Sequence, residues 1–279
     1  MKDITGEDIK ILRNCTGAGI MDCKKALIFS NGDIDKAIEE LKKKGIILAE
    51  KKSCRKTNEG LINILISENK RKCLIIEVNC ETDFVAKKIE FKNYVFSLSD
   101  YILKNDIYNI EDFNNLCPKF LENEKINLIS RLGENICVKK INCIINENGY
   151  SVGFYMHYIN EISKIGAIVL LNGYNDELAH DLAMQVVALN PDYISDCDIP
   201  ASKLEYEKNI LLFKAEELYK NKSKTVVHKI VEGQLEKFVN DMTLYGQFFI
   251  KDNKKLVKDI LSLYNLKVLN MVRFEIGLQ

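Results

Sequence analysis

The sequence predicts an α+β protein with a short N-terminal helical unit, a sheet-containing core and a projecting helical hairpin. Three observations predict this fold class. Residues 5–44 carry the apolar periodicity of short helices, residues 60–79 contain two runs with strand-like patterning, and one strand–corner–helix pattern occurs twice. A chain of 279 residues is long enough to divide into two or three modules with buried cores.

The first helix is predicted to begin near residue 5. Thr5 and Asp8 have the spacing of a capping box. The apolar face expected of this helix consists of Ile9, Leu12 and Cys15. The sequence "TGAG" at 16–19 should break the helix, because glycine readily leaves the helical conformation.

A second helix is predicted for residues 20–29, and a third follows the turn at residues 31–33. Asp33 is the expected N-cap of the third helix, and Gly45 is its expected end. The residues of this helix that should face inward are Ile34, Ala37, Ile38 and Leu41. We expect such a small three-helix unit to serve docking rather than chemistry.

The core is predicted to begin with a β-hairpin, in which "GLINILIS" (60–67) and "CLIIEVN" (73–79) flank the polar turn "ENKRK". A long helix should follow, and helical patterning continues to Leu128. The apolar face of the long helix consists of Phe91, Val95, Leu98 and Ile102. Further strands are predicted at 135–145, 150–159, 165–173 and 267–277.

Two further patterns complete the architecture. The segments "LIIEVNCETDFVAKKIEFKNYVFSL" and "AIVLLNGYNDELAHDLAMQVVAL" share one order, a buried strand, Asn, a short corner, Asp and a helix, which indicates a duplicated unit. Residues 202–239 are highly charged and helical, interrupted by "NKS" at 221–223. This segment predicts a helical hairpin that projects from the body.

Charge and cysteine usage narrow the function classes. The 40 basic and 40 acidic residues balance, so the chain lacks the one-signed field that binders of nucleic acids or anionic membranes usually carry. The nine cysteines form no Cys-x-x-Cys pair and indicate reduced thiols of a cytosolic protein. The acidic N-terminal segment fits neither a secretory signal nor a transit peptide, and no apolar stretch reaches the length of a membrane span. We therefore expect a cytoplasmic protein.

No catalytic or metal-binding set can be nominated from the sequence. The three histidines, His157, His180 and His228, have no cysteine or acid at metal-ligand spacing. Neither a Ser-His-Asp nor a Cys-His set is recognisable from residue order. We expect no cofactor, no metal and no enzymatic activity.

The segment "TGAGIMDCKKAL" at 16–27 is similar to a phosphate-binding loop but fails its tests. Asp22 occupies the position of the third glycine of a dinucleotide loop, the preceding segment is helical, and no Gly-Lys-Ser/Thr follows. An acid would repel a pyrophosphate at that place. The glycines are better explained by a tight interhelical turn, which leaves Lys24 and Lys25 on a solvated face.

The segment "NCETDFVAKK" at 79–88 leaves two alternatives for Phe84. Thr82 or Asp83 can cap a helix that begins there, and Phe84 would lie at its very start. Phe84 is either one more aromatic residue of the core or an exposed probe beside a carboxylate. The second copy of the pattern carries Glu177 in place of the aromatic, so the corner itself does not require one.

Taken together, these segments closely resemble bacterial elongation factor Ts, the guanine-nucleotide exchange factor for elongation factor Tu. The stretches that carry the resemblance are "LRNCTGAGIMDCKKAL", "EVNCETDFVAKK", "LGENICVKK", "YNDELAHDLAMQVVALNPDYI", "KIVEGQLEKF" and "VRFEIG". They occur in one order over essentially the whole chain. The resemblance implies a UBA-like three-helix module at 1–54, a core N-subdomain at 55–145 and a core C-subdomain at 146–279. The two subdomains should be similar, with antiparallel sheets, and a dimerisation hairpin is inserted at about 200–240.

The resemblance also implies roles for particular residues. Thr82, Asp83, Phe84 and Val85 should enter the nucleotide domain of Tu and help to dislodge its magnesium. Arg13, Met21, Lys24, Leu132, Gly133 and His157 should make further contacts with Tu. The implied partner is Tu in its GDP-bound and nucleotide-free forms, with no direct nucleotide, nucleic acid or membrane contact, and the hairpin can serve homodimerisation.

Four departures from the family pattern affect these expectations. "YINEISK" replaces a short Gly-rich link after His157, "NKS" replaces a common Gly-Lys-Pro turn, and Phe248 stands where proline often follows Gln. The sequence also ends at Gln279, soon after "RFEIG", without the extra C-terminal helix of some members, which implies weaker or differently distributed binding. The alternative function is a helical interaction module or RNA-associated scaffold that has lost exchange activity, and a Cys-dependent enzyme has little support.

Overall fold

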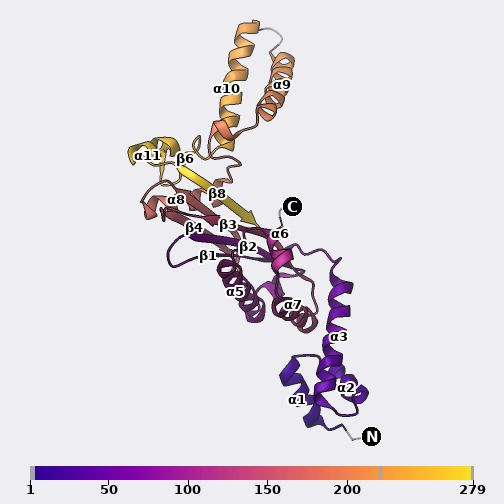
Figure 1. Cartoon of the computed structure of the whole chain (residues 1–279). Helices are drawn as coiled ribbons and strands as arrows, with labels where there is room; N and C mark the ends of the chain where they lie inside the picture. Colours follow the sequence, from indigo (N-terminus) through magenta and orange to yellow (C-terminus); the bar gives the residue numbers. More distant parts are fainter. Residues whose placement is uncertain (1–3, 220–221, 278–279) are drawn as a thin grey trace.

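The computed structural model describes residues 4–219 and 222–277 (Figure 1). An N-terminal helical module is followed by two three-stranded antiparallel sheets with covering helices, and a helical hairpin projects from the core (Figure 1). This arrangement confirms the α+β class. The division at 1–54, 55–145 and 146–279 stays a prediction. None of the helices in the described ranges is long and apolar enough to cross a membrane.

The N-terminal module consists of α1 (Gly6–Thr16), α2 (Ile20–Phe29) and α3 (Ile34–Lys52). Thr5 and Asp8 form the expected capping box of α1, and Asp33 caps α3. The module has its own small core, which includes Leu12, Cys23, Ala26, Leu27 and Ala37. Cys15 was expected on the apolar face of α1 but is exposed. The reason is geometric, because each three-residue step turns a helix by about 300°, so the face drifts away from Cys15.

The third helix does not end at Gly45. Helix α3 continues through Gly45 to Lys52, and Gly45 is buried where α3 crosses α7 (Lys119–Leu132). A Cβ atom at Gly45 would lie 3.3 Å from Ile126 Cγ2. The glycine therefore serves the close approach of two helices, and the sequence pattern alone could not distinguish this role from a helix end.

The first sheet has the strand order β1–β2–β3, with β2 in the middle. Its outer face is covered by helices, and the expected apolar face of the long helix (Phe91, Val95, Leu98 and Ile102) is fully buried there. The strands are β1 (Glu59–Ile66), β2 (Lys72–Cys80) and β3 (Ile136–Ile145). The remaining helices of this half are α4 (Asp83–Ala86), α5 (Ile89–Lys104) and α6 (Ile110–Leu116).

The second sheet repeats the connectivity of the first. A hairpin leads into a helix, and a later strand returns beside the second strand of the hairpin, which gives the order β4–β5–β8. This repetition confirms the duplicated strand–helix unit. The elements are β4 (Val152–Ile159), β5 (Ile162–Leu171), α8 (Asp176–Leu189), the 3-10 helix η1 (Asp196–Asp198), β6 (Phe248–Phe249), β7 (Asp252–Leu256), α11 (Val257–Leu263) and β8 (Val268–Glu275). The short elements η1, β6, β7 and α11 were not predicted.

The two sheets pack face to face through their inner surfaces. The residues between them include Ile62, Ile64, Cys73, Ile75, Ile144, Val152, Ile168 and Leu170. In β2, Leu74 and Ile76 face the helices while Cys73 and Ile75 face the other sheet. Both faces of β2 are therefore buried, which explains why its sequence is a continuous apolar run rather than an alternating one.

The projecting hairpin consists of α9 (Ala201–Leu218) and α10 (Lys224–Met242) (Figure 1). Its own core is small and includes Ala215, Val227 and Val231. The predicted break at 221–223 falls between the helices, although residue 221 lies outside the described residues.

Replacing Gly45 tests the close packing of α3 on α7. We expect Gly45→Leu to lower the free energy of unfolding by about 1–3 kcal/mol, because the added side chain overpacks the contact with Ile126. Gly233→Ala in α10 is the matched control. No atom lies within 4 Å of the added Cβ there, and the change should stabilise by about 0.5–1 kcal/mol. Thermal denaturation of both variants measures the difference, and equal effects would contradict the packing role of Gly45.

Candidate functional site

The candidate site is the corner formed by residues 81–85, where β2 ends and α4 begins. Thr82 is the N-cap of α4, and its Oγ1 accepts a hydrogen bond from the Val85 backbone N–H at 3.4 Å. The helix is only four residues long, so its own hydrogen bonds contribute little to its position. Contacts with other segments must hold the corner in place.

Two glutamates, one on each side, accept hydrogen bonds from the opposite segment and fix the corner to the loop between α7 and β3. Glu134 accepts from the Thr82 backbone N–H at 3.0 Å and from Thr82 Oγ1 at 2.6 Å. In return, Glu81 accepts from the Asn135 backbone N–H at 2.7 Å. We call this arrangement the Glu81–Glu134 clamp. Sequence reasoning missed both residues, although each is the glutamate of a signature segment, "CETD" and "LGEN".

Phe84 is the most exposed side chain of the corner. It is 75% exposed, whereas Val85 beside it is 3% exposed and packs in the core with Phe91 and Val95. The structure therefore excludes Phe84 as a core residue. Phe84 does not share the apolar face of Phe91, because α4 ends at Ala86 and α5 starts at Ile89, so one helical period does not span both phenylalanines.

Asp83 forms an ion pair with Lys87 one helical turn later, with 2.8 Å between Asp83 Oδ2 and Lys87 Nζ. The hydrogen bond from Lys87 lowers the pKa of Asp83, and the nearby positive charge of Lys164 lowers it further. Lys164 belongs to β5 and also pairs with Glu59. The carboxylate next to Phe84 is therefore held in its charged form.

Cys80, the last residue of β2, stabilises the corner from the side of the sheet. Its thiol donates to the Thr82 carbonyl oxygen at 3.1 Å, and burial raises the pKa of Cys80 to about 12. The thiol is neutral at physiological pH, so its part here is structural rather than nucleophilic.

The N-terminal module contacts the core next to this corner. Arg131 Nη2 lies 3.6 Å from Glu90 Oε1, close to the start of α5. The guanidinium of Arg131 also passes over Gly17, where a Cβ would lie 2.4 Å from Arg131 Nε. The three segments that carry the signatures, at 16–19, 81–85 and 131–135, thus come together in the fold.

The other residues that were expected to bind the partner lie on the N-terminal module, at the end of α7 and on β4. Arg13 on α1 and Met21 and Lys24 on α2 are exposed. Leu132 is half-buried against the core, and Gly133 ends α7, with its carbonyl oxygen accepting a hydrogen bond from Lys52. These placements describe positions, and the roles of the residues stay predictions.

His157 lies on β4, which is an edge strand of the second sheet. Its ring is exposed and packs near Tyr155, with 6.4 Å between the ring centroids. The segment "YINEISK" that follows keeps β4 paired with β5, with a register shift between His157 and Tyr158. Ile159 and Ile162 pair across a tight turn whose two residues have positive φ, and Lys92 of α5 donates to the Glu161 carbonyl oxygen at 3.3 Å. The longer hairpin therefore brings its tip beside the helix that follows the corner.

An exposed aromatic side chain beside a fixed carboxylate, at a place where three loops meet, is typical of a surface that contacts another protein. Comparison with known proteins identifies the family within this class. Residues 81–278 match the family model for elongation factor Ts. The chain belongs to the elongation factor Ts family, and its general role is that of a translation elongation factor.

Three relatives illustrate the extent of the similarity, and each is described as elongation factor Ts. The protein of Hydrogenovibrio crunogenus is 36% identical over 98% of this chain and 92% of its own length. The protein of Ruthia magnifica is 38% identical over 98% of this chain and 91% of its own length. The protein of Limosilactobacillus reuteri is 37% identical over 99% of this chain and 94% of its own length.

The lowered pKa of Asp83 can be measured directly. We expect the carboxyl carbon of Asp83 to titrate below the ordinary Asp range in an NMR experiment, and Lys87→Met should raise this pKa. Because the pKa of Asp83 is lowered in the folded protein, the ion pair stabilises the corner at pH values above the ordinary Asp pKa. This stabilisation is lost as the pH falls through the lowered pKa of Asp83. Lys88→Met, which removes a neighbouring exposed lysine, is the control. An unchanged Asp83 titration in Lys87→Met would contradict the assignment.

Proposed function

We propose that this protein promotes the release of GDP from elongation factor Tu so that GTP can bind. It contacts Tu through the corner at 81–85, dislodges the magnesium ion of the Tu nucleotide site, and makes or breaks no covalent bond itself. The observation that carries the proposal is the exposed Phe84 on a corner that the rest of the fold holds in place. We place this activity in the cytoplasm.

The physical basis of such exchange is linkage between two binding equilibria. If this protein and GDP with magnesium favour opposite arrangements of the Tu site, each partner weakens the binding of the other by the same factor. A coupling of about 1–3 kcal/mol already changes the affinity by roughly 5- to 150-fold. Magnesium would neutralise phosphate charge in a nucleotide site of this kind, so its displacement would remove a main attraction for GDP.

The corner residues divide this task between them. Phe84 enters an apolar space between helices of Tu, where burial of its ring stabilises the displaced arrangement. Asp83 provides a carboxylate whose charge Lys87 already maintains, and it bonds to groups that the displacement exposes. Thr82 and Val85 hold the other two residues in position, Thr82 through Glu134 and Val85 through the core.

The remaining expected contacts extend the interface. Arg13, Met21 and Lys24 present a mixed cationic and apolar surface on the N-terminal module, and Leu132 and Gly133 lie at the end of α7, next to the loop that clamps the corner. His157 belongs to a more distant contact through the edge strand β4. Together they determine how the corner is oriented on Tu.

Truncating Phe84 separates a binding role from a structural one. We expect Phe84→Ala to change the free energy of unfolding by only about 0.5 kcal/mol, because the ring is exposed. GDP release from Tu should fall by roughly 10- to 100-fold, because burial of a Phe ring contributes about 1.5–3 kcal/mol. Release of labelled GDP from Tu with catalytic amounts of this protein measures the effect.

Two further phenylalanines of α5 provide controls. Phe96→Ala, at another exposed ring, should keep both stability and exchange, whereas Phe91→Ala, in the core, should cost about 3–5 kcal/mol of stability. Normal exchange by a folded Phe84→Ala protein would contradict the role of Phe84. No acceleration by the unmodified protein would leave an interaction scaffold as the remaining function.

We also propose that the hairpin α9–α10 mediates homodimerisation. Tyr206 and Phe213 lie seven residues apart on α9 and are both exposed, so they form an apolar stripe on one face. The small internal core of the hairpin does not use them. A second copy of the hairpin would bury this stripe.

Sedimentation of the free protein tests the dimer. We expect the unmodified protein to sediment as a concentration-dependent dimer, and Phe213→Ser should shift it towards the monomer because it removes apolar surface from the interface. Phe248→Ser, at an exposed phenylalanine on β6 outside the hairpin, should leave the distribution unchanged. A protein that is monomeric at every concentration would overturn the dimer.

A further inference from the structure

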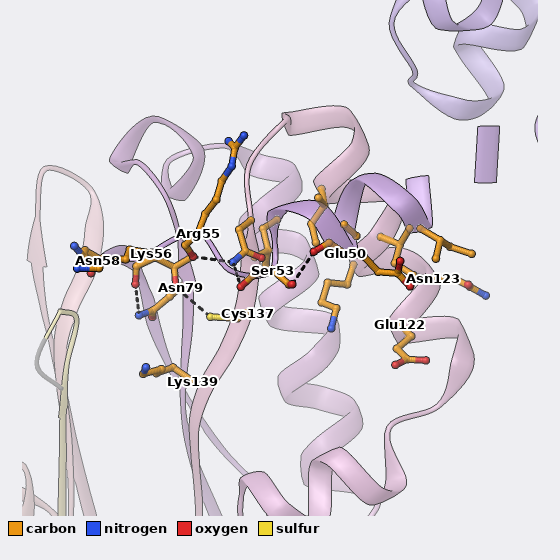
Figure 2. Close-up of a pocket in the computed structure, with 18 of the residues that line it drawn as sticks. Glu50, Ser53, Arg55, Lys56, Asn58, Asn79, Glu122, Asn123, Cys137 and Lys139 are labelled. Atoms are coloured by element: carbon orange, nitrogen blue, oxygen red, sulfur yellow. Dashed lines mark hydrogen bonds between the residues drawn. The ribbon is translucent and has the colours of Figure 1, made fainter. Parts of the chain in front are cut away.

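A groove of about 830 Å³ lies between α3, α7 and the beginning of β3 (Figure 2). The connector from α3 to β1, residues 53–58, runs along it. The corner residues 82–85 do not line the groove. The groove adjoins the clamp through Asn135 and Arg55 but does not include the corner itself.

The groove has an apolar floor with one polar feature. The aliphatic lining residues are Ile46, Ala49, Ile126, Ile129 and Ile136. Asn79 also lines the groove, is buried, and donates from Nδ2 to the Thr57 carbonyl oxygen at 3.1 Å. Its Oδ1 accepts no hydrogen bond within the described part of the chain. The groove thus offers mainly apolar contact, and Asn79 in its lining keeps one buried acceptor without a partner among the described residues.

Positive charge dominates the rim. The cationic lining residues are Arg55, Lys56, Lys119, Lys125 and Lys139, against the two acids Glu50 and Glu122. Arg55 is paired with Glu81, 3.4 Å away, whereas the four lysines form no ion pair with any residue that the structure describes. Such a local excess stands out in a chain whose basic and acidic residues are equal in number. Cations around a concave surface attract an anionic partner.

The lining favours a protein segment over other anions. None of the described residues that line the groove is aromatic, so they provide no stacking platform of the kind on which single-stranded nucleic acids usually rest. Figure 2 shows Arg55 and Lys139 extending in different directions rather than towards one point, which does not suit a single phosphate. An aliphatic floor between two helices with charges at the rim is the geometry that receives an amphipathic helix.

We propose that this groove binds an acidic, amphipathic helical segment of a partner protein. Aliphatic side chains of that segment rest on the isoleucines of the floor, and its carboxylates face the four rim lysines. This activity goes beyond nucleotide exchange, because it does not use the corner at 81–85 and leaves the Glu81–Glu134 clamp in place.

Fluorescence anisotropy of the full-length protein with a labelled probe tests the proposal. The probe is a peptide of roughly 15 residues, long enough to form a helix, with leucines on one face and glutamates on the other. A second peptide carries glutamine in place of every glutamate. We expect the acidic peptide to bind more tightly, and Lys56→Glu combined with Lys139→Glu should weaken its binding by about tenfold or more.

Lys254→Glu combined with Lys258→Glu is the matched control. It makes the same change of net charge at exposed lysines outside the groove and should leave peptide binding unchanged. Hydrogen exchange should show that the peptide protects residues 46–58 and 119–129. The groove variant should still release GDP from Tu at the normal rate.

Several outcomes would overturn the proposal. They are equal binding of the glutamine peptide, equal weakening in the control variant, protection elsewhere in the chain, or displacement of the peptide by a single-stranded RNA oligonucleotide that binds more tightly. Loss of GDP release in the groove variant would also overturn it, because the groove would then belong to the exchange surface. Normal peptide binding by a protein without exchange activity would count against the proposed function alone.

Discussion

The Glu81–Glu134 clamp is the interaction on which the corner depends. A four-residue helix cannot hold its position by its own hydrogen bonds. Thr82 donates two hydrogen bonds to the Glu134 carboxylate, and the Asn135 backbone N–H donates one to the Glu81 carboxylate. Hydrogen bonds to charged groups are worth about 1.5–3 kcal/mol each, more than a neutral pair. The clamp joins segments that lie about fifty residues apart, and the buried strands β2 and β3 bring them within reach. The order of the corner is therefore a consequence of the sheet.

A fixed corner changes the energetics of an exposed aromatic residue. While the ring of Phe84 is exposed to water, it contributes no free energy of burial. A partner that covers the ring would gain about 1.5–3 kcal/mol of such free energy. Because the backbone beneath it is already ordered by the clamp and by Val85, little conformational entropy is lost in that step. The fold thus presents an exposed apolar side chain on an ordered backbone.

The duplicated unit has an exposed side chain at the same position, because Glu177, which corresponds to Phe84, is 87% exposed. Asn175 and Leu178 take the positions of Thr82 and Val85, as an N-cap and a buried residue. Asp176, at the position of Asp83, is instead tied to its own chain, by Ser151 Oγ at 2.6 Å and by Lys70 Nζ at 2.8 Å. These hydrogen bonds, with that of Lys70 the largest cause, lower the pKa of Asp176. The two corners share their connectivity and an exposed position, and they differ in the side chain found there, an aromatic ring at Phe84 and a carboxylate at Glu177.

The sequence by itself determined the fold class, the order of the main helices and strands, the hairpin and the repeated unit, because apolar periodicity and capping residues are local signals. It left Phe84 undecided between core and surface, missed Glu81 and Glu134, and placed the end of α3 at Gly45. Only the tertiary structure decided these points. Exposure depends on which distant segments cover a residue, a carboxylate clamp depends on two loops meeting in space, and a glycine ends a helix or admits a neighbour according to what packs against it.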